Sequence, residues 1–143
     1  MPGKKLNSRF ITYNKLKEAK LSNTNDILKM SLEDAVKIIQ DPILQNIILL
    51  REFIKEKRTL QYFNYDKTTA KYRMITFRKL IEINKINENE ITKLVLEDLE
   101  NIIKNEDFYN ILLLRKLLKS GNSFDYFDEN IKLERKEENN EQQ

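Results

Sequence analysis

The chain contains no cysteine and no histidine, and only two glycines and two prolines among its 143 residues. Without cysteine there can be no disulfide, no thiolate nucleophile and no cysteine zinc site. Without histidine the chain also lacks the commonest general base and the commonest transition-metal ligand. Three of the four glycine and proline residues are Pro2, Gly3 and Gly121, so the interior lacks the turn residues of hairpins and sandwiches. We therefore expect an all-α fold.

Catalytic and targeting motifs are missing as well. There is no glycine-rich phosphate loop, no calcium loop, and no serine with a base in a recognisable context. No stretch approaches the roughly 18 apolar residues of a membrane span, and the basic start Met1 to Lys5 is not followed by the apolar core of a signal peptide. The sequence thus predicts a cytoplasmic or nucleoplasmic protein, neither secreted nor bound to a membrane, which is not an enzyme and holds no cofactor or metal.

What the sequence does contain is an internal repeat. The hexapeptide NIILLR at 46–51 returns as NILLLR at 110–115, which is 64 positions later (110 − 46). The same offset, kept without a gap, gives 23 identical residues over the 58 positions from 9 to 66. A bias toward Ile, Lys and Asn raises such a count, but it does not hold one register over this length. We interpret the chain as a tandem duplication of a supersecondary unit of about 64 residues.

The repeat divides the chain into five parts. We predict an N-terminal basic lead at 1–8, repeat units at 9–66 and 73–130 with a linker at 67–72 between them, and a disordered charged tail at 131–143. Each unit is expected to form three helices. The first follows Thr12 or Thr76, the second carries the apolar stripe of 27–39 or 91–103, and the third begins after the capping residue Asp41 or Asn105.

The third helix of each unit is apolar around most of its circumference, which is typical of a buried helix. A unit of about 60 residues would be only marginally stable alone, because small domains bury a small share of their surface. We therefore expect the two units to pack into one helical body, and a homodimer would serve equally well.

Polar residues recur at inward positions of both units. A buried charge needs a partner, because its desolvation is otherwise costly. On a helical wheel Asp34 and Asp98 fall within the apolar stripe, whereas Glu33 and Glu97 lie at its polar margin. We predict the structural ion pairs Asp34–Arg51 and Asp98–Arg115, with Asn46 and Asn110 as structural polar residues. The alternative is a pair of equivalent functional sites built from carboxylate and guanidinium groups.

Segment 55–79 carries interleaved basic and aromatic residues, and the corresponding end of the second unit lacks this character. Such residues can contact phosphates and stack on bases. The candidates are Lys57, Arg58, Tyr65, Lys67, Lys71, Tyr72, Arg73, Arg78 and Lys79. In the second unit Lys57 and Arg58 are replaced by Gly121 and Asn122, while Asp125 and Asp128 appear. The alternative interpretation of this segment is a solvated connector whose aromatic residues cover helix ends.

We therefore predict a non-enzymatic helical adaptor or regulatory protein that binds a protein partner through surfaces of the duplicated units. The alternative is a DNA- or RNA-binding protein that uses segment 55–79. A third candidate is an enzyme acting through carboxylates, because such a site has no signature in a single sequence.

Overall fold

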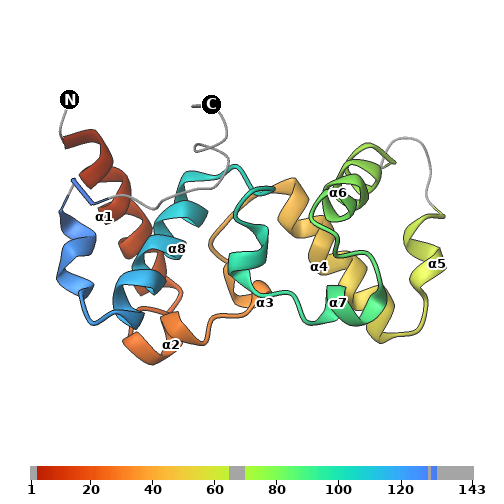
Figure 1. The fold of residues 1–143 in the computed structure, drawn as a ribbon, viewed down its shortest axis with the longest axis horizontal. Coiled ribbons are helices and arrows are strands. Elements are labelled where there is room, and N and C mark those ends of the chain that lie inside the picture. The colour runs from red at the N-terminus through yellow and green to blue at the C-terminus, as the bar shows by residue number, and fades with distance from the viewer. Residues whose placement is uncertain (1–2, 65–69, 129, 132–143) are drawn as a thin grey trace.

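The computed structural model describes residues 3–64, 70–128 and 130–131, and the regular structure in these ranges is entirely helical (Figure 1). The first half of the chain forms α1 (Gly3–Glu18), α2 (Thr24–Leu28), α3 (Leu32–Ala35), α4 (Pro42–Lys55) and α5 (Thr59–Tyr62). The second half forms α6 (Ala70–Glu82), α7 (Glu88–Thr92), the 3-10 helix η1 (Leu96–Leu99), α8 (Glu106–Lys119) and the 3-10 helix η2 (Ser123–Phe127). The all-α prediction is confirmed.

Helices from the two halves are interleaved. α1 packs against α8 and η2, whereas α6 packs against α4. The short helices follow the same rule, since α2 contacts α8 and α7 contacts α4. In Figure 1, α1, α2, α8 and η2 form one end of the elongated molecule, and α4, α5, α6 and α7 form the other. Each end of the molecule is therefore built from both halves of the chain.

The helices α4 and α8 begin where the sequence predicts. The side chain of Asp41 accepts hydrogen bonds from the backbone N–H groups of Ile43 and Leu44 at 2.9 and 3.1 Å, and Pro42 occupies the first turn of α4. The side chain of Asn105 accepts one from the N–H of Phe108 at 3.0 Å. These caps satisfy N–H groups that have no partner inside the helix, and proline lacks such a group altogether.

The prediction of one continuous second helix over 27–39 and 91–103 is wrong. α2 ends at Leu28, and α3 begins at Leu32 after a new cap at Ser31. The Ser31 hydroxyl accepts from the N–H of Asp34 at 3.1 Å, and the Asp34 carboxylate accepts from the N–H of Ser31 at 3.3 Å. This reciprocal capping box starts a second helical turn in a new direction. The second half is interrupted at the corresponding place, between α7 and η1, where the Asp98 carboxylate accepts from the N–H of Val95 at 2.9 Å but Val95 has no hydroxyl to complete the box.

The first helix of each half begins earlier than predicted. α1 starts at Gly3 and α6 at Ala70, so Thr12 and Thr76 lie inside their helices, fully buried, instead of capping them. Thr12 is tolerated there because its buried hydroxyl donates a hydrogen bond to the carboxylate of Asp107 at 2.6 Å. The predicted lead at 1–8 thus overlaps α1, and the predicted linker at 67–72 overlaps the start of α6. The predicted tail lies outside the described residues beyond Ile131.

Four helices end with a residue in the left-handed region of backbone space. α1 and α6 are followed by Lys20 and Asn84, each with φ of 60°, and α4 and α8 by Lys57 and Gly121, with φ of 61° and 79°. This conformation closes the last turn and lets the chain reverse. Glycine adopts it without strain, whereas lysine does not.

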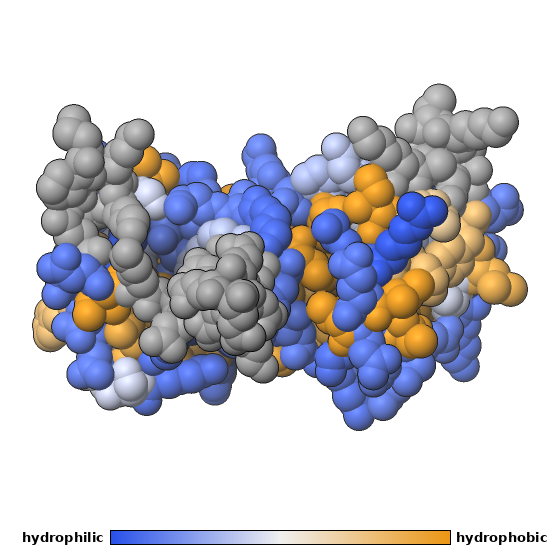
Figure 2. Space-filling view, turned by 45° about the horizontal axis from the view of Figure 1, so that its top comes forward, coloured by the Kyte–Doolittle hydropathy of each residue, from blue (hydrophilic) through white to orange (hydrophobic). Residues whose placement is uncertain are grey.

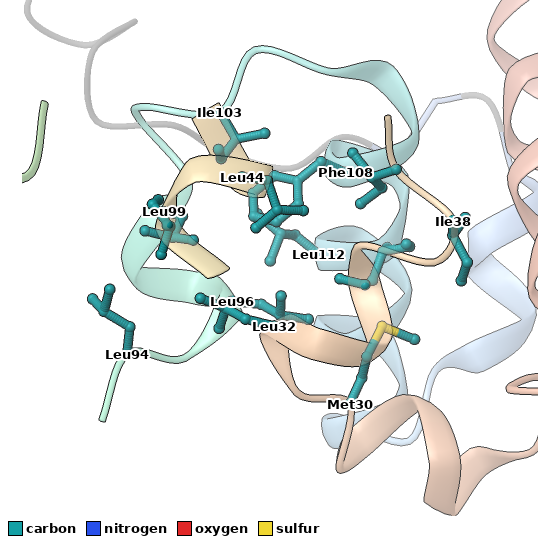
Figure 3. Packing of buried hydrophobic residues seen from close by; sticks show 14 of the residues in the cluster. Met30, Leu32, Ile38, Leu44, Leu94, Leu96, Leu99, Ile103, Phe108 and Leu112 are labelled. Atoms are coloured by element: carbon teal, nitrogen blue, oxygen red, sulfur yellow. The ribbon is translucent and has the colours of Figure 1, made fainter. Parts of the chain in front are cut away.

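One hydrophobic cluster runs through both halves of the chain. Its central part is formed by α3, η1 and the first turns of α4 and α8 (Figure 3). There Leu32 lies beside Leu96, and Leu44 points toward Phe108. Residues at corresponding positions of the two halves therefore meet in the middle of the molecule, and neither half has a core of its own.

Candidate functional site

Two buried arginines bind across the halves. Arg51 of α4 donates from Nη1 to the carbonyl oxygens of Ile91 and Thr92 at 2.8 and 3.0 Å. Arg115 of α8 donates from Nη1 to the carbonyl oxygens of Ile27 and Leu28 at 2.7 and 3.2 Å. These carbonyls belong to the last turns of α7 and α2, where backbone oxygens lack partners within the helix and attract positive charge.

The carboxylate partner of each arginine differs from the prediction. Arg51 Nε lies 3.0 Å from Glu33 Oε2, and Arg115 Nε lies 2.8 Å from Glu97 Oε2. The predicted pairs Asp34–Arg51 and Asp98–Arg115 are wrong. Both aspartates instead accept from backbone N–H groups three residues earlier in the chain, at the starts of α3 and η1. Glu33 and Glu97 have the longer side chains and reach the guanidinium groups.

The environment of the two glutamates favours their charged form. Burial alone would raise the pKa of each carboxyl, but the hydrogen bonds and charge of Arg51 and Arg115 outweigh it. The pKa values of Glu33 and Glu97 are therefore held below the ordinary value of 4.5. Because the arginines are bound by both carboxylates and carbonyls, we assign these groups a structural role.

A second pair of arginines also joins the halves. Arg9 Nη1 donates to the carbonyl oxygens of Tyr126 and Asp128 at 3.0 and 2.6 Å, and the Tyr126 hydroxyl donates back to the carbonyl of Arg9 at 2.8 Å. Arg73 Nη1 donates to the carbonyl of Tyr62 at 2.8 Å, and the Tyr62 hydroxyl donates to the carbonyl of Arg73 at 3.3 Å. Burial raises the pKa of the Tyr126 phenol. Arg9 and Arg73 stand at corresponding positions of the repeat, and this recurrence is the sequence signal for the contact.

The basic aromatic segment 55–79 is only partly available to a ligand. Arg73 is engaged as described, and its guanidinium lies 5.3 Å from the centre of the Tyr62 ring. Arg58 binds Glu56 Oε1 at 2.6 Å and Gln61 Oε1 at 2.8 Å. Lys57 is exposed at the end of α4. Two of the residues predicted to contact phosphates, Arg58 and Arg73, are therefore already bound to groups of the protein itself.

The remaining predicted residues of this segment are divided between the described and undescribed parts of the chain. Tyr72 and Arg78 are exposed on α6, and Lys79 is half-buried. Lys71 belongs to α6, but its side chain lies outside the described part, as do Tyr65 and Lys67 entirely. Only Tyr72 and Arg78 thus combine the predicted chemistry with an exposed position on this helix.

The predicted polar residues Asn46 and Asn110 differ in their surroundings. Asn110 is buried and donates to Ser8 Oγ at 2.7 Å and to Thr12 Oγ1 at 3.0 Å, which joins α8 to α1. Asn46 is half-exposed and donates only to the carbonyl of Pro42, in its own helix, at 2.8 Å. A role in holding the two halves together therefore falls to Asn110 alone.

The network around Asn110 extends to a carboxylate. Thr12 Oγ1 and Lys15 Nζ donate to the two carboxylate oxygens of Asp107, each at 2.6 Å. A hollow of about 600 Å³ opens beside Lys15 and Asp107 and is lined mostly by polar and charged side chains. Both Asp107 oxygens thus accept hydrogen bonds from side chains of α1, so this residue joins α8 to α1 as Asn110 does.

The second half exposes apolar residues where the first half has polar ones. Ile81, Ile86 and Val95 are 49, 48 and 50 % exposed. Shifted by 64 positions, the corresponding residues are Lys17, Ser22 and Ser31. Figure 2 shows apolar side chains gathered on the end of the molecule formed by α4, α5, α6 and α7. We call the exposed side chains of Ile81 on α6, Ile86 between α6 and α7, and Val95 directly before η1 the second-half apolar surface.

The part of the chain that the structure describes contains neither a cluster of metal-binding side chains nor a membrane-spanning helix. It holds no group of three or more acidic side chains placed to bind a metal ion. None of its helices has the length and apolar character needed to cross a bilayer.

Comparison of the chain with family models, curated proteins and solved structures gave no match.

Proposed function

We propose that the protein is a non-enzymatic helical adaptor that binds another protein through the second-half apolar surface. The observation that carries the proposal is the replacement of Lys17, Ser22 and Ser31 by three half-exposed apolar residues at the corresponding positions. Two copies of a duplicated unit begin with the same sequence and keep the residues that their shared fold needs. Solvent-exposed apolar side chains are not among those residues. Their gain in one half favours a surface that a partner covers.

A tandem duplication of a unit of about 64 residues is part of this proposal. It is supported by contacts that recur at this offset, since Arg51 and Arg115 bind corresponding glutamates and corresponding helix ends. Duplication frees one copy of a surface to change while the other keeps the original residues. The partner is thus expected to contact the second half and to present apolar side chains of its own. The expected cytoplasmic or nucleoplasmic location stays a prediction.

A site-specific photocrosslinker tests this proposal. We would place it at Ile86 and, as the matched control, at Ser22, irradiate cells that make each variant, and purify the identified partner for calorimetry. Ile86→Asp should then weaken binding at least about tenfold, as truncation of an interface anchor does, while Ser22→Asp leaves it unchanged. Equal crosslinking at both positions, or equal affinities of both variants, would rule out the second-half apolar surface.

Nucleic-acid binding is the second candidate, favoured by the exposure of Tyr72 and Arg78 on one helix. Fluorescence anisotropy of labelled RNA and DNA at two salt concentrations tests it. Binding that falls steeply with salt and is lost in Tyr72→Ala/Arg78→Ala would support this function. Absence of binding at low salt would eliminate it.

A further inference from the structure

The short helices α5 and η2 present one large apolar residue each to solvent. Leu60 of α5 is 85 % exposed and Phe124 of η2 is 92 % exposed, and the two stand at corresponding positions, 64 residues apart (124 − 60). Figure 1 places these helices at opposite ends of the molecule. Neither residue belongs to the second-half apolar surface, so these two ends require an explanation of their own.

A hollow of about 460 Å³ lies beside Leu60, between the end of α4, α5 and the start of α7. Its apolar walls are Ile54 and Leu60, and its polar lining includes Lys57, Arg58 and Glu88. A cavity of about 150 Å³ accommodates benzene in another protein, so this hollow is large enough for a phenyl ring. The phenyl ring that the molecule exposes most fully is at its other end.

The two short segments that carry these exposed residues differ in the sign of their net charge. Segment 55–64 around Leu60 has Lys55, Lys57 and Arg58 against Glu56, a net charge of +2 (3 − 1). The corresponding segment 119–128 around Phe124 has one lysine against two aspartates, a net charge of −1 (1 − 2). Opposite charges around an apolar anchor and its socket favour encounter in one orientation.

We infer that the protein associates with further copies of itself head to tail, with Phe124 of one copy seated in the hollow beside Leu60 of the next. Asp125 and Asp128 then face Lys57 of the neighbouring copy. Because the anchor and the hollow lie at opposite ends, one molecule cannot fill its own hollow. A contact between two different surfaces repeats from copy to copy and builds an open chain or a ring. This inference does not depend on the proposed partner protein.

Sedimentation velocity over a range of protein concentrations tests the inference. The mass of the wild-type protein should rise with concentration, and added salt should reduce it because salt screens opposite charges. Phe124→Ser should weaken association at least about tenfold. Ile11→Ser, which removes another half-exposed apolar residue, is the control and should associate as the wild type does. A wild-type protein that stays at monomer mass, or a Phe124→Ser variant that associates normally, would overturn the inference.

A mixing experiment tests the head-to-tail arrangement itself. Phe124→Ser keeps the hollow but lacks the anchor, whereas Lys57→Glu/Leu60→Asp keeps the anchor but lacks the hollow. All three residues are exposed, so both variants should keep the wild-type circular dichroism spectrum. Each variant alone should be monomeric, and an equimolar mixture should form a complex of two copies and nothing larger. A mixture that stays monomeric, or one that grows beyond two copies, would contradict this arrangement.

Discussion

Removal of the Arg115 side chain should destabilise the whole protein, because this residue holds α8 of the second half to α2 of the first. Its side chain is only 6 % exposed. It donates to the carbonyls of Ile27 and Leu28 and to both carboxylate oxygens of Glu97. Arg115→Ala would remove the 2.7 Å bond to the carbonyl of Ile27 and leave it the longer bond from the N–H of Met30 at 3.4 Å.

The magnitude follows from the two kinds of bond. The Glu97 side chain is 40 % exposed, so its ion pair is worth about 0 to 1 kcal/mol, as for other pairs open to water. Each hydrogen bond from a charged donor to a buried carbonyl is worth about 1.5 to 3 kcal/mol. Arg115→Ala should therefore cost about 3 to 5 kcal/mol. At roughly 3 °C per kcal/mol for a chain of this size, the Tm should fall by about 10 to 15 °C.

Urea and thermal unfolding followed by circular dichroism measure this loss. Glu97→Gln is the matched control, since it removes the ion pair and leaves the carbonyl bonds, and it should cost no more than about 1 kcal/mol. A cost below about 1 kcal/mol for Arg115→Ala, or equal costs for the two variants, would refute the reasoning.

Three further predictions concern pH, helix ends and buried hydroxyls. The pKa of the Glu97 carboxyl is lower in the folded state than its unfolded value of 4.5. Its contribution to the free energy of unfolding is therefore fully present above pH 4.5 and is lost as the pH falls through the folded-state pKa. Glu97→Gln should flatten the dependence of the urea midpoint on pH in that acidic range. At the left-handed helix ends, Gly121→Ala should lower the free energy of unfolding in urea melts by about 1 kcal/mol, and Lys57→Gly should raise it by a similar amount. An added Cβ at Gly121 meets no atom within 4 Å, so only the backbone conformation determines the effect there. Thr76 Oγ1 is buried without a hydrogen-bond partner, whereas Thr12 Oγ1 donates to Asp107. In the same urea melts, Thr76→Val should be neutral or stabilising, and Thr12→Val should lower the free energy of unfolding by about 1 to 3 kcal/mol. Equal effects of the two substitutions would contradict this difference in bonding.

The starts of α4 and α8 could be predicted from the sequence because residues close to each start determine it. Each has a capping side chain directly before a long apolar run, and both signals act within a few residues. The exchange of helices between the halves could not be predicted in this way. Arg115 binds the carbonyl of Ile27 instead of Ile91, and the same residue type stands at both corresponding positions. A repeat looks the same whether its contacts lie within one copy or between two.

The wrong ion pairs have a single cause. With one continuous helix over 27–39, Asp34 falls on the apolar side and Glu33 at its edge. The capping box at Ser31 breaks that helix and turns the chain. The Asp34 carboxylate therefore accepts from the backbone N–H of Ser31, and the Glu33 carboxylate accepts from Arg51 instead. The corresponding break before η1 exposes Val95, which the apolar spacing had placed in the core. The second-half apolar surface could therefore be recognised only in the structure.

We expect the two halves of the chain to fold only together, because the arginine contacts and the shared core join one half to the other and the exposed surfaces belong to that joined fold. Circular dichroism of the separate fragments 1–66 and 67–143, alone and mixed in equal amounts, tests it most directly. We predict that neither fragment alone shows a cooperative thermal transition, and that the mixture gains helix and forms a one-to-one complex. Cooperative unfolding of either fragment alone, with no change on mixing, would contradict the claim.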